Sequence, residues 1–268
     1  MGKLAFMTHL SFLDYLPLWG VFVATVVMIA LSMEVGFRIG SWRRRHSGLE
    51  KDAPVGALVG ATLALLGFML ATTFGIAVSR FDLRLNTFLD EVDAISTALL
   101  RAEFLSNPIQ RDVKKALGDY IDARLAATDP TTLNIAIARS EELHHVLWDL
   151  TIAAERSTAN QVTAGLFIES INEIIDLHTR RVIAAVGARI PGIVWMALYA
   201  VTIFGMGELG YQAALAGSAR SPATVGLILS FTLILWIIVD LDRPFEGALT
   251  VSQAAMRDLQ RSLNKDPS

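Results

Sequence analysis

Four long apolar segments alternate with polar stretches along the chain, and they define its predicted elements. The segments cover about residues 17–37, 55–79, 191–215 and 222–240. Each is long enough to cross hydrocarbon about 30 Å thick as a helix, which takes roughly 20 residues. Each also begins at a proline, which suits the first turn of a helix because the N–H groups there have no intrahelical partner. These prolines are Pro17, Pro54, Pro191 and Pro222. The pattern predicts four transmembrane helices.

The connections between the segments predict how the helices are grouped. Short links at about 38–53 and 216–221 force helices one and two, and helices three and four, to run antiparallel as two hairpins. We name the membrane side that holds these links side A. The opposite side, side B, receives both termini and the long polar stretch between the hairpins.

That polar stretch predicts a helical domain. It is rich in Ala, Leu, Glu and Arg, and proline coincides with capping residues at Asn107-Pro108 and at 128–131. The expected helices run over about 82–106, 109–127, 132–156 and 158–190. We expect the first to continue from membrane helix two, and the last to continue into membrane helix three without a break.

The predicted fold class is therefore an all-α membrane protein, with four transmembrane helices in two hairpins flanking a helical extramembrane domain. Its expected parts are a first transmembrane hairpin at 1–81, the helical domain at 82–190, a second transmembrane hairpin at 191–243 and an amphipathic C-terminal tail at 244–268.

Composition agrees with a membrane protein and excludes several functions. Hydrophobic residues make up 53% of the chain, and the mean hydropathy is +0.48, which is too apolar for an ordinary soluble fold. The net charge of −3 gives no electrostatic case for binding nucleic acid. The absence of cysteine excludes disulfides and cysteine-ligated metals.

The only spacing that suits a metal site is weak. Glu141, His145 and Asp149 fall on one face of an expected helix, but with no ligands known from a second helix a solvated polar face is the better interpretation. The chain carries no phosphate-binding loop and no nucleophile motif. We therefore expect no catalytic residues, no metal, no cofactor and no enzymatic activity.

The second apolar segment carries small residues at helical spacing. They are Gly56, Gly60, Ala64, Gly67, Ala71 and Gly75, and we call them the small-residue stripe. Such a face lets helices approach closely in lipid, so one interpretation is a packing seam within or between protomers. The other is that this helix lines a pore, because hydroxyl groups and hydrophobic constrictions are common in ion paths. The pore candidates on this helix are Thr62, Phe68, Thr72, Thr73 and Phe74.

Two acidic residues lie within the apolar segments. Glu34 and Glu208 each stand seventeen residues after the proline that begins their helix. Both carboxylates are therefore expected at a similar depth, about 25 Å along their helices and close to side A. A charge near hydrocarbon suggests an ion path. For Glu34, a pair with Arg38 four residues later is an equal alternative.

The segment after the fourth apolar run contains the sequence Asp240-Leu241-Asp242-Arg243-Pro244-Phe245-Glu246-Gly247, followed by Val251-Ser252. This motif, with Ser79-Arg80-Phe81-Asp82 and Asp90-Glu91, resembles the bestrophin-like membrane proteins, a bacterial family of unassigned function that is distantly related to bestrophin ion channels. The resemblance covers about residues 54–256. The motif residues that carry it most specifically are Asp240, Asp242, Arg243, Pro244, Phe245 and Gly247. We expect Pro244 to end helix four, and Gly247 to permit a turn before Ser252 caps a short amphipathic helix.

The resemblance implies a function. Bestrophins are oligomeric ion channels with four membrane helices per subunit and a helical domain between the second and third. It therefore implies a homo-oligomeric channel or channel-like protein that acts on inorganic ions, a pentamer by analogy. Helix two is expected nearest the axis, with Glu34 and Glu208 forming an acidic ring that favours cations. The alternative is a non-conducting sensor or scaffold whose helical domain binds a ligand or partner protein.

The expected location is the bacterial inner (plasma) membrane, with the lipid bilayer as partner and multiple passes through it. Two arguments about orientation disagree. The short links on side A carry Arg43, Arg44, Arg45, Lys51 and Arg220, so the positive-inside rule places side A in the cytoplasm and the helical domain outside. The bestrophin analogy places that domain inside. Short segments on side B also carry Lys3, Arg243, Arg257, Arg261 and Lys265, so the basic residues are divided almost evenly between the two sides. We favour side A inside, because three of the arginines on that side directly follow the first helix.

Overall fold

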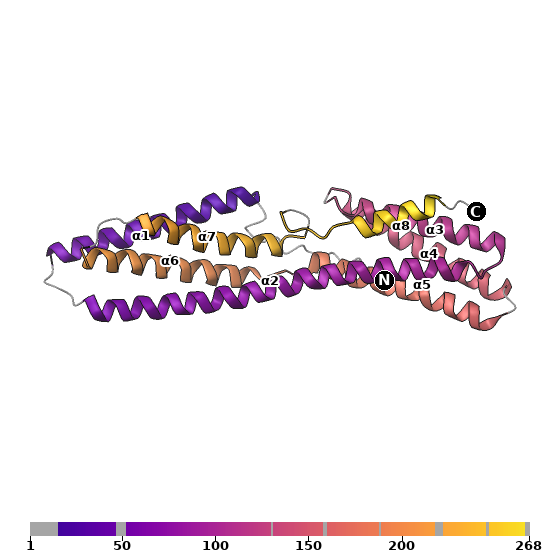
Figure 1. Cartoon of the computed structure of the whole chain (residues 1–268), viewed down its shortest axis with the longest axis horizontal. Helices are drawn as coiled ribbons and strands as arrows, with labels where there is room; N and C mark the ends of the chain where they lie inside the picture. Colours follow the sequence, from indigo (N-terminus) through magenta and orange to yellow (C-terminus); the bar gives the residue numbers. More distant parts are fainter. Residues whose placement is uncertain are drawn as a thin grey trace. The chain divides into compact units, whose positions relative to one another are not determined.

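The structure is a computed structural model. It describes residues 16–46, 52–129, 131–157, 160–187, 189–217, 222–244 and 247–265, and no strand occurs in these ranges. The helices are α1 (Leu18–His46), α2 (Asp52–Ala102), α3 (Asn107–Ala126), α4 (Leu133–Ser157), α5 (Gln161–Val182), the π-helix η2 (Ile183–Gly187), α6 (Gly192–Leu215), α7 (Pro222–Asp242) and α8 (Ala254–Lys265) (Figure 1).

Four of the described helices, α1, α2, α6 and α7, are long and apolar enough to cross a membrane. This confirms the predicted all-α fold with four membrane helices. The proline signals locate their starts closely: α1 and α6 begin directly after Pro17 and Pro191, and α7 begins at Pro222. The second helix begins at Asp52, two residues before Pro54, so that proline lies within its first turn.

The described helices form two compact units. The membrane unit contains α1, the part of α2 up to Arg80, α6 and α7, and it ends at Leu249. The extramembrane unit contains the rest of α2, then α3, α4, α5, η2 and, from Thr250 onward, α8. The C-terminal tail, expected as one separate part, is therefore divided between the two units.

Helix α2 is continuous from Asp52 to Ala102, which confirms that the first extramembrane helix continues from membrane helix two. The expectation that the last extramembrane helix continues into membrane helix three without a break is wrong. The chain passes through the π-helix η2 and is not helical from Arg189 to Pro191. Proline disfavours helical geometry in the residue before it, which accounts for the break. The freed N–H of Ile190 donates to Oδ1 of Asp242 at 2.9 Å.

In the membrane unit, α1 and α6 pack closely through glycines. A Cβ atom on Gly36 would lie 1.9 Å from the carbonyl oxygen of Gly207, and one on Gly210 would lie 2.1 Å from that of Met33. The hydroxyl of Ser32 donates to the carbonyl of Ile203 across the same interface. Glycine is thus required here for the two backbones to meet, as is common where membrane helices pack closely.

In the extramembrane unit, the helices enclose one hydrophobic core. Its largest buried side chains come from four helices, among them Ile95 of α2, Leu117 of α3, Leu147 of α4 and Phe167 of α5. Met256 of α8 joins the same core. The short helix α8 begins after Ser252, whose hydroxyl accepts a hydrogen bond from the N–H of Ala254, as the sequence predicted.

Candidate functional site

The small-residue stripe lies on the outside of the membrane unit. All its members except Gly56 are exposed. A Cβ atom added to Gly60, Gly67 or Gly75 would meet no other atom within 4 Å. The residues of α2 that face the bundle are instead larger, such as Leu66 and Leu70, both buried. The described part of the chain therefore leaves the stripe uncovered from Gly60 onward, and a packing seam within the protomer does not explain that part.

The pore candidates on α2 divide into two groups. Phe68, Thr72 and Phe74 are exposed, and Phe68 keeps 70% of its surface. Thr73 is buried, and its hydroxyl donates to the carbonyl of Met69 at 2.7 Å. Thr62 is half-buried, with its methyl group 3.4 Å from where a Cβ on Gly205 of α6 would lie. Only the first group shares the exposed side of α2 with the stripe.

The two acidic residues lie on neighbouring parallel helices. Two hydrogen bonds between α1 and α6 show how the helices are aligned. Ser32 bonds to Ile203, which is 171 positions later in the chain, and Thr25 bonds to Tyr199, which is 174 positions later. Since Glu34 and Glu208 are also 174 positions apart, this register supports their expected similar depth.

Their surroundings differ. Arg38 donates from Nε to Oε1 of Glu34 at 2.8 Å, so this carboxylate is paired on its own helix. Atom Oε2 of Glu208 is buried and has no hydrogen-bond partner among the described residues.

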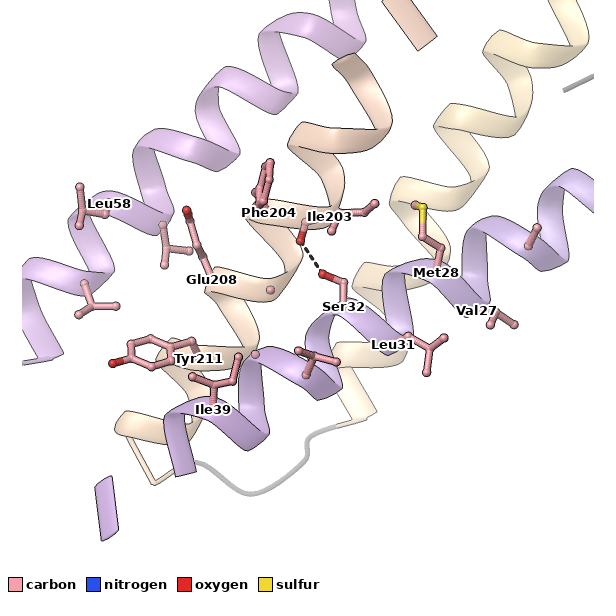
Figure 2. Close-up of a pocket in the computed structure, with 16 residues that line it drawn as sticks. Val27, Met28, Leu31, Ser32, Ile39, Leu58, Ile203, Phe204, Glu208 and Tyr211 are labelled. Atoms are coloured by element: carbon pink, nitrogen blue, oxygen red, sulfur yellow. Dashed lines mark hydrogen bonds between the residues drawn. The ribbon is translucent and has the colours of Figure 1, made fainter. Parts of the chain in front are cut away.

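Glu208 lines a groove formed by α1, α2 and α6 (Figure 2). Its volume is about 1030 Å³. The wall contributed by α2 consists of Val55, Leu58 and Val59, none of which belongs to the small-residue stripe. Figure 2 shows the Glu208 side chain extending from α6 toward α2, beside Phe204. The structure therefore places Glu208 on a different face of α2 from the stripe, and Glu34 is not among the groove residues.

The motif after α7 organises the end of the membrane unit. The carboxylate of Asp240 accepts the N–H groups of Ala248 and Leu249 at 2.9 and 3.1 Å. Gly247 has a φ of +137°, and a Cβ there would lie 1.9 Å from Oδ1 of Asp240, so only glycine fits.

The other motif residues hold neighbouring segments. Asp242 accepts the N–H of Ile190, and Arg243 donates from Nη2 to the carbonyl of Leu16 at 2.6 Å. Helix α7 ends at Asp242, two residues before Pro244, as expected. Phe245 lies outside the described residues. These roles are structural, since each side chain binds backbone groups of a turn or a helix break.

The extramembrane unit contains a buried polar cluster that sequence reasoning did not identify. Its centre is the fully buried carboxylate of Glu91 on α2. Tyr120 of α3 donates to Oε1 at 2.7 Å. Arg124, also on α3, lies with Nε 2.9 Å from the same oxygen, and Arg181 of α5 donates to Oε2. One carboxylate thus joins three helices.

Two histidines complete this cluster. An Nη1 N–H of Arg124 donates to Nδ1 of His178 at 3.4 Å, and the His178 ring lies 4.7 Å from the ring of His144. Burial and the nearby Arg124 guanidinium lower the pKa of His144 to about 4 and that of His178 to about 3. Both rings are therefore neutral near pH 7. Burial and the Glu91 carboxylate raise the pKa of Tyr120 well above its usual range.

A sequence signal for this cluster existed. Arg124 follows the buried Leu117, Tyr120 and Ile121 on the same face of α3, and a charged residue in an apolar stripe needs a buried partner. The spacing noted earlier at Glu141, His145 and Asp149 instead belongs to an exposed face of α4, as the solvated interpretation predicted.

Comparisons with known proteins identify a family and solved structures with a similar fold. A family model described as Bestrophin-like domain matches residues 21–256. Among solved structures, a membrane protein with a single substitution has a TM-score of 0.70 and 16% identity, covering 92% of this chain and 98% of its own. A single-substitution variant of a bacterial bestrophin homolog from Klebsiella pneumoniae has a TM-score of 0.65 and 18% identity, covering 91% and 98%. Comparison with curated proteins finds no match.

The family match begins at residue 21 in α1, whereas the resemblance predicted from the sequence begins at about residue 54. Both end at Met256 of α8. The family match includes nearly all of α1, the other three membrane helices, the extramembrane helices α3, α4 and α5, and the motif after α7. With this coverage, the chain belongs to the Bestrophin-like family.

Proposed function

We propose that the protein is a homo-oligomeric, channel-like protein of the bacterial inner membrane, in which the small-residue stripe of α2 faces the central axis. The observation that carries the proposal is the exposure of this stripe in the apolar part of α2. Family membership supports it, because bestrophins are channels.

The physical argument starts from the cost of glycine. Each glycine in a helix interior costs about 1 kcal/mol relative to alanine, and a small side chain gains little packing against lipid. Three glycines on one exposed face are favourable if a neighbouring helix packs against them or if the face borders a narrow lumen. Both arrangements bring further copies of α2 to this face. A homo-oligomer around α2 therefore explains the stripe better than a monomer in lipid does.

Cysteine accessibility tests the pore assignment directly, because the chain has no cysteine of its own. Ala71 belongs to the exposed stripe, whereas Ala77 on the same helix is completely buried. We expect a charged, water-soluble thiol reagent to reduce the current of the Ala71→Cys variant in planar bilayers and to leave the matched Ala77→Cys variant unchanged.

Other outcomes decide against the proposal. A purified protein that conducts at no voltage or salt composition, or that is a stable monomer, is not a channel. Conduction without modification of Ala71→Cys would place the stripe in a closed seam between copies.

The preference for cations is a separate part of the proposal, and it depends on Glu34 and Glu208. Glu34 is paired with Arg38, and Glu208 lies in the groove away from the stripe. Reversal potentials in a salt gradient test this part separately. If Glu34→Gln or Glu208→Gln shifts the reversal potential toward the equilibrium potential of the anion, the acidic ring contributes to selectivity. Unchanged reversal potentials in both variants would show that the two carboxylates are not part of the ion path.

The alternative is a non-conducting sensor or scaffold whose helical domain binds a ligand or partner protein. The buried cluster around Glu91 gives that domain a defined polar centre. Copurification from native membranes distinguishes this alternative, since a scaffold should retain a stoichiometric partner.

A further inference from the structure

The groove between α1, α2 and α6 has the features of a lipid-binding site. Its volume of about 1030 Å³ is at the upper end of the range for ligand pockets, roughly 300–1,000 Å³. Its rim is apolar and is left uncovered by the described part of the chain: Leu31 and Val35 of α1, Leu58 of α2 and Phe204 of α6 keep 59%, 54%, 67% and 66% of their surface. Such walls suit an acyl chain.

One polar group in this apolar groove lacks a partner. The hydroxyl of Ser32 already donates to the carbonyl of Ile203, as the dashed line in Figure 2 shows. Glu208 is the only acidic residue among those that line the groove, and its Oε2 atom is buried without a hydrogen bond in the described part of the chain. A buried carboxylate oxygen without a donor is unfavourable, so the site is complementary to a cation that carries N–H groups.

The position of Glu208 along α6 matches the depth of a headgroup. It is the seventeenth residue of α6, which begins at Gly192, and seven residues remain before the helix ends at Leu215. At 1.5 Å per residue the carboxylate lies about 10 Å from the end of the helix at side A. An acyl chain in the groove can therefore extend toward the membrane centre while a headgroup reaches Glu208.

We propose that this groove binds a phospholipid with a primary ammonium headgroup, of the phosphatidylethanolamine class. One acyl chain lies along the apolar walls, and the ammonium group donates a hydrogen bond to the carboxylate of Glu208. Phosphatidylglycerol offers no cation, and the trimethylated headgroup of phosphatidylcholine offers a cation without an N–H donor. The site does not depend on whether the protein conducts ions.

Lipid retention measured by native mass spectrometry tests this proposal. The purified full chain is mixed with phosphatidylethanolamine, phosphatidylcholine and phosphatidylglycerol that have identical acyl chains. We expect preferential retention of phosphatidylethanolamine. Because a hydrogen bond to a charged group contributes about 1.5–3 kcal/mol, Glu208→Gln should weaken that retention about tenfold or more, to the level of the other two lipids.

Two variants complete the test. Glu34→Gln is the matched control, since it removes a carboxylate at similar depth that Arg38 already pairs, and it should retain the preference. Val35→Trp fills the groove and keeps the charge, so it should lower retention of all three lipids. Equal loss in the Glu34 and Glu208 variants, unchanged retention in Glu208→Gln, or an oligomer image with a helix of a second copy in the groove would each overturn the proposal.

Discussion

Glu91 stabilises the extramembrane unit by contacting side chains of two other helices. Its carboxylate is fully buried and is contacted by Tyr120, Arg124 and Arg181, which bring α3 and α5 to α2. Two guanidinium groups around one carboxylate leave this cluster with one positive charge in excess. Its stability therefore depends on the single negative charge at its centre.

We predict that Glu91→Gln strongly destabilises the protein. Removing one partner of a buried ion pair typically costs about 3–5 kcal/mol, because the remaining charges stay buried without compensation. We expect the melting temperature in detergent to fall by roughly 10 °C. Asp93→Asn provides the matched control, since Asp93 is exposed on the same helix. Equal melting temperatures for the two variants would contradict this role.

The buried histidines predict a pH dependence of stability. In the unfolded chain a histidine takes up a proton near pH 6.5, whereas the folded pKa values are about 4 for His144 and about 3 for His178. Between these values the unfolded state binds more protons, so stability falls as pH falls. Each histidine contributes a slope of about 1.4 kcal/mol per pH unit below pH 6.5, ending near its folded pKa.

Thermal unfolding from pH 7.5 to 4.5 measures this slope. His178→Gln should reduce it by about half, because one of the two buried rings no longer titrates on unfolding. His145→Gln should leave it unchanged, since the neighbouring His145 is exposed. An unaltered slope in the His178 variant would show that other groups cause the acid sensitivity.

At the scale of elements, the close pairing of α1 and α6 holds the membrane unit together. Gly36 and Gly40 of α1 and Gly207 and Gly210 of α6 line the interface. The carbonyl oxygens near these glycines belong to helix backbone, which moves less readily than a flexible side chain. We therefore expect this interface to tolerate no added carbon atom.

We predict that Gly36→Ala and Gly210→Ala each destabilise the membrane unit by about 1–3 kcal/mol or more, as overpacking does. The new Cβ atoms would lie 1.9 and 2.1 Å from backbone oxygens. Gly60→Ala is the matched control, because a Cβ there meets no atom of the described chain. Melting temperature and the monodisperse yield in detergent report the difference; a normal Gly36→Ala variant would contradict the packing.

These glycines also show what the sequence could predict. Proline and hydropathy locate the membrane helices because both act within a single segment. The small-residue stripe of α2 is long and regular, which made it the predicted packing face. The tight interface within the chain, between α1 and α6, uses Gly36 and Gly40 instead. That spacing of four was visible in the sequence, but choosing between two small-residue faces requires knowing which helices are neighbours.

The candidate site could be predicted from the sequence less completely than the membrane helices. The sequence identified Glu208 and its depth, but the groove around it depends on three helices from distant parts of the chain. Likewise, His145 was noted for its spacing, while the buried cluster uses His144 on the neighbouring face. A local pattern gives the face of a helix; only the tertiary structure decides what covers that face.

At the scale of the whole molecule, the orientation in the membrane decides which compartment the extramembrane unit contacts. The arginines Arg43, Arg44 and Arg45 lie at the end of α1 on side A. Positively charged residues next to a membrane helix favour the cytoplasmic side. We therefore predict that side A is cytoplasmic and that the extramembrane unit is outside.

Single cysteines test this prediction with two matched alanine replacements. Ala126 is exposed at the end of α3 in the extramembrane unit, and Ala216 is exposed directly after α6 on side A. In spheroplasts, a membrane-impermeant maleimide should label Ala126→Cys and leave Ala216→Cys unlabelled until the membrane is opened. The cysteine-free parent protein should not react in either condition. The reverse pattern would place the helical unit in the cytoplasm, as in the bestrophin analogy, and would show that the three arginines do not set the orientation.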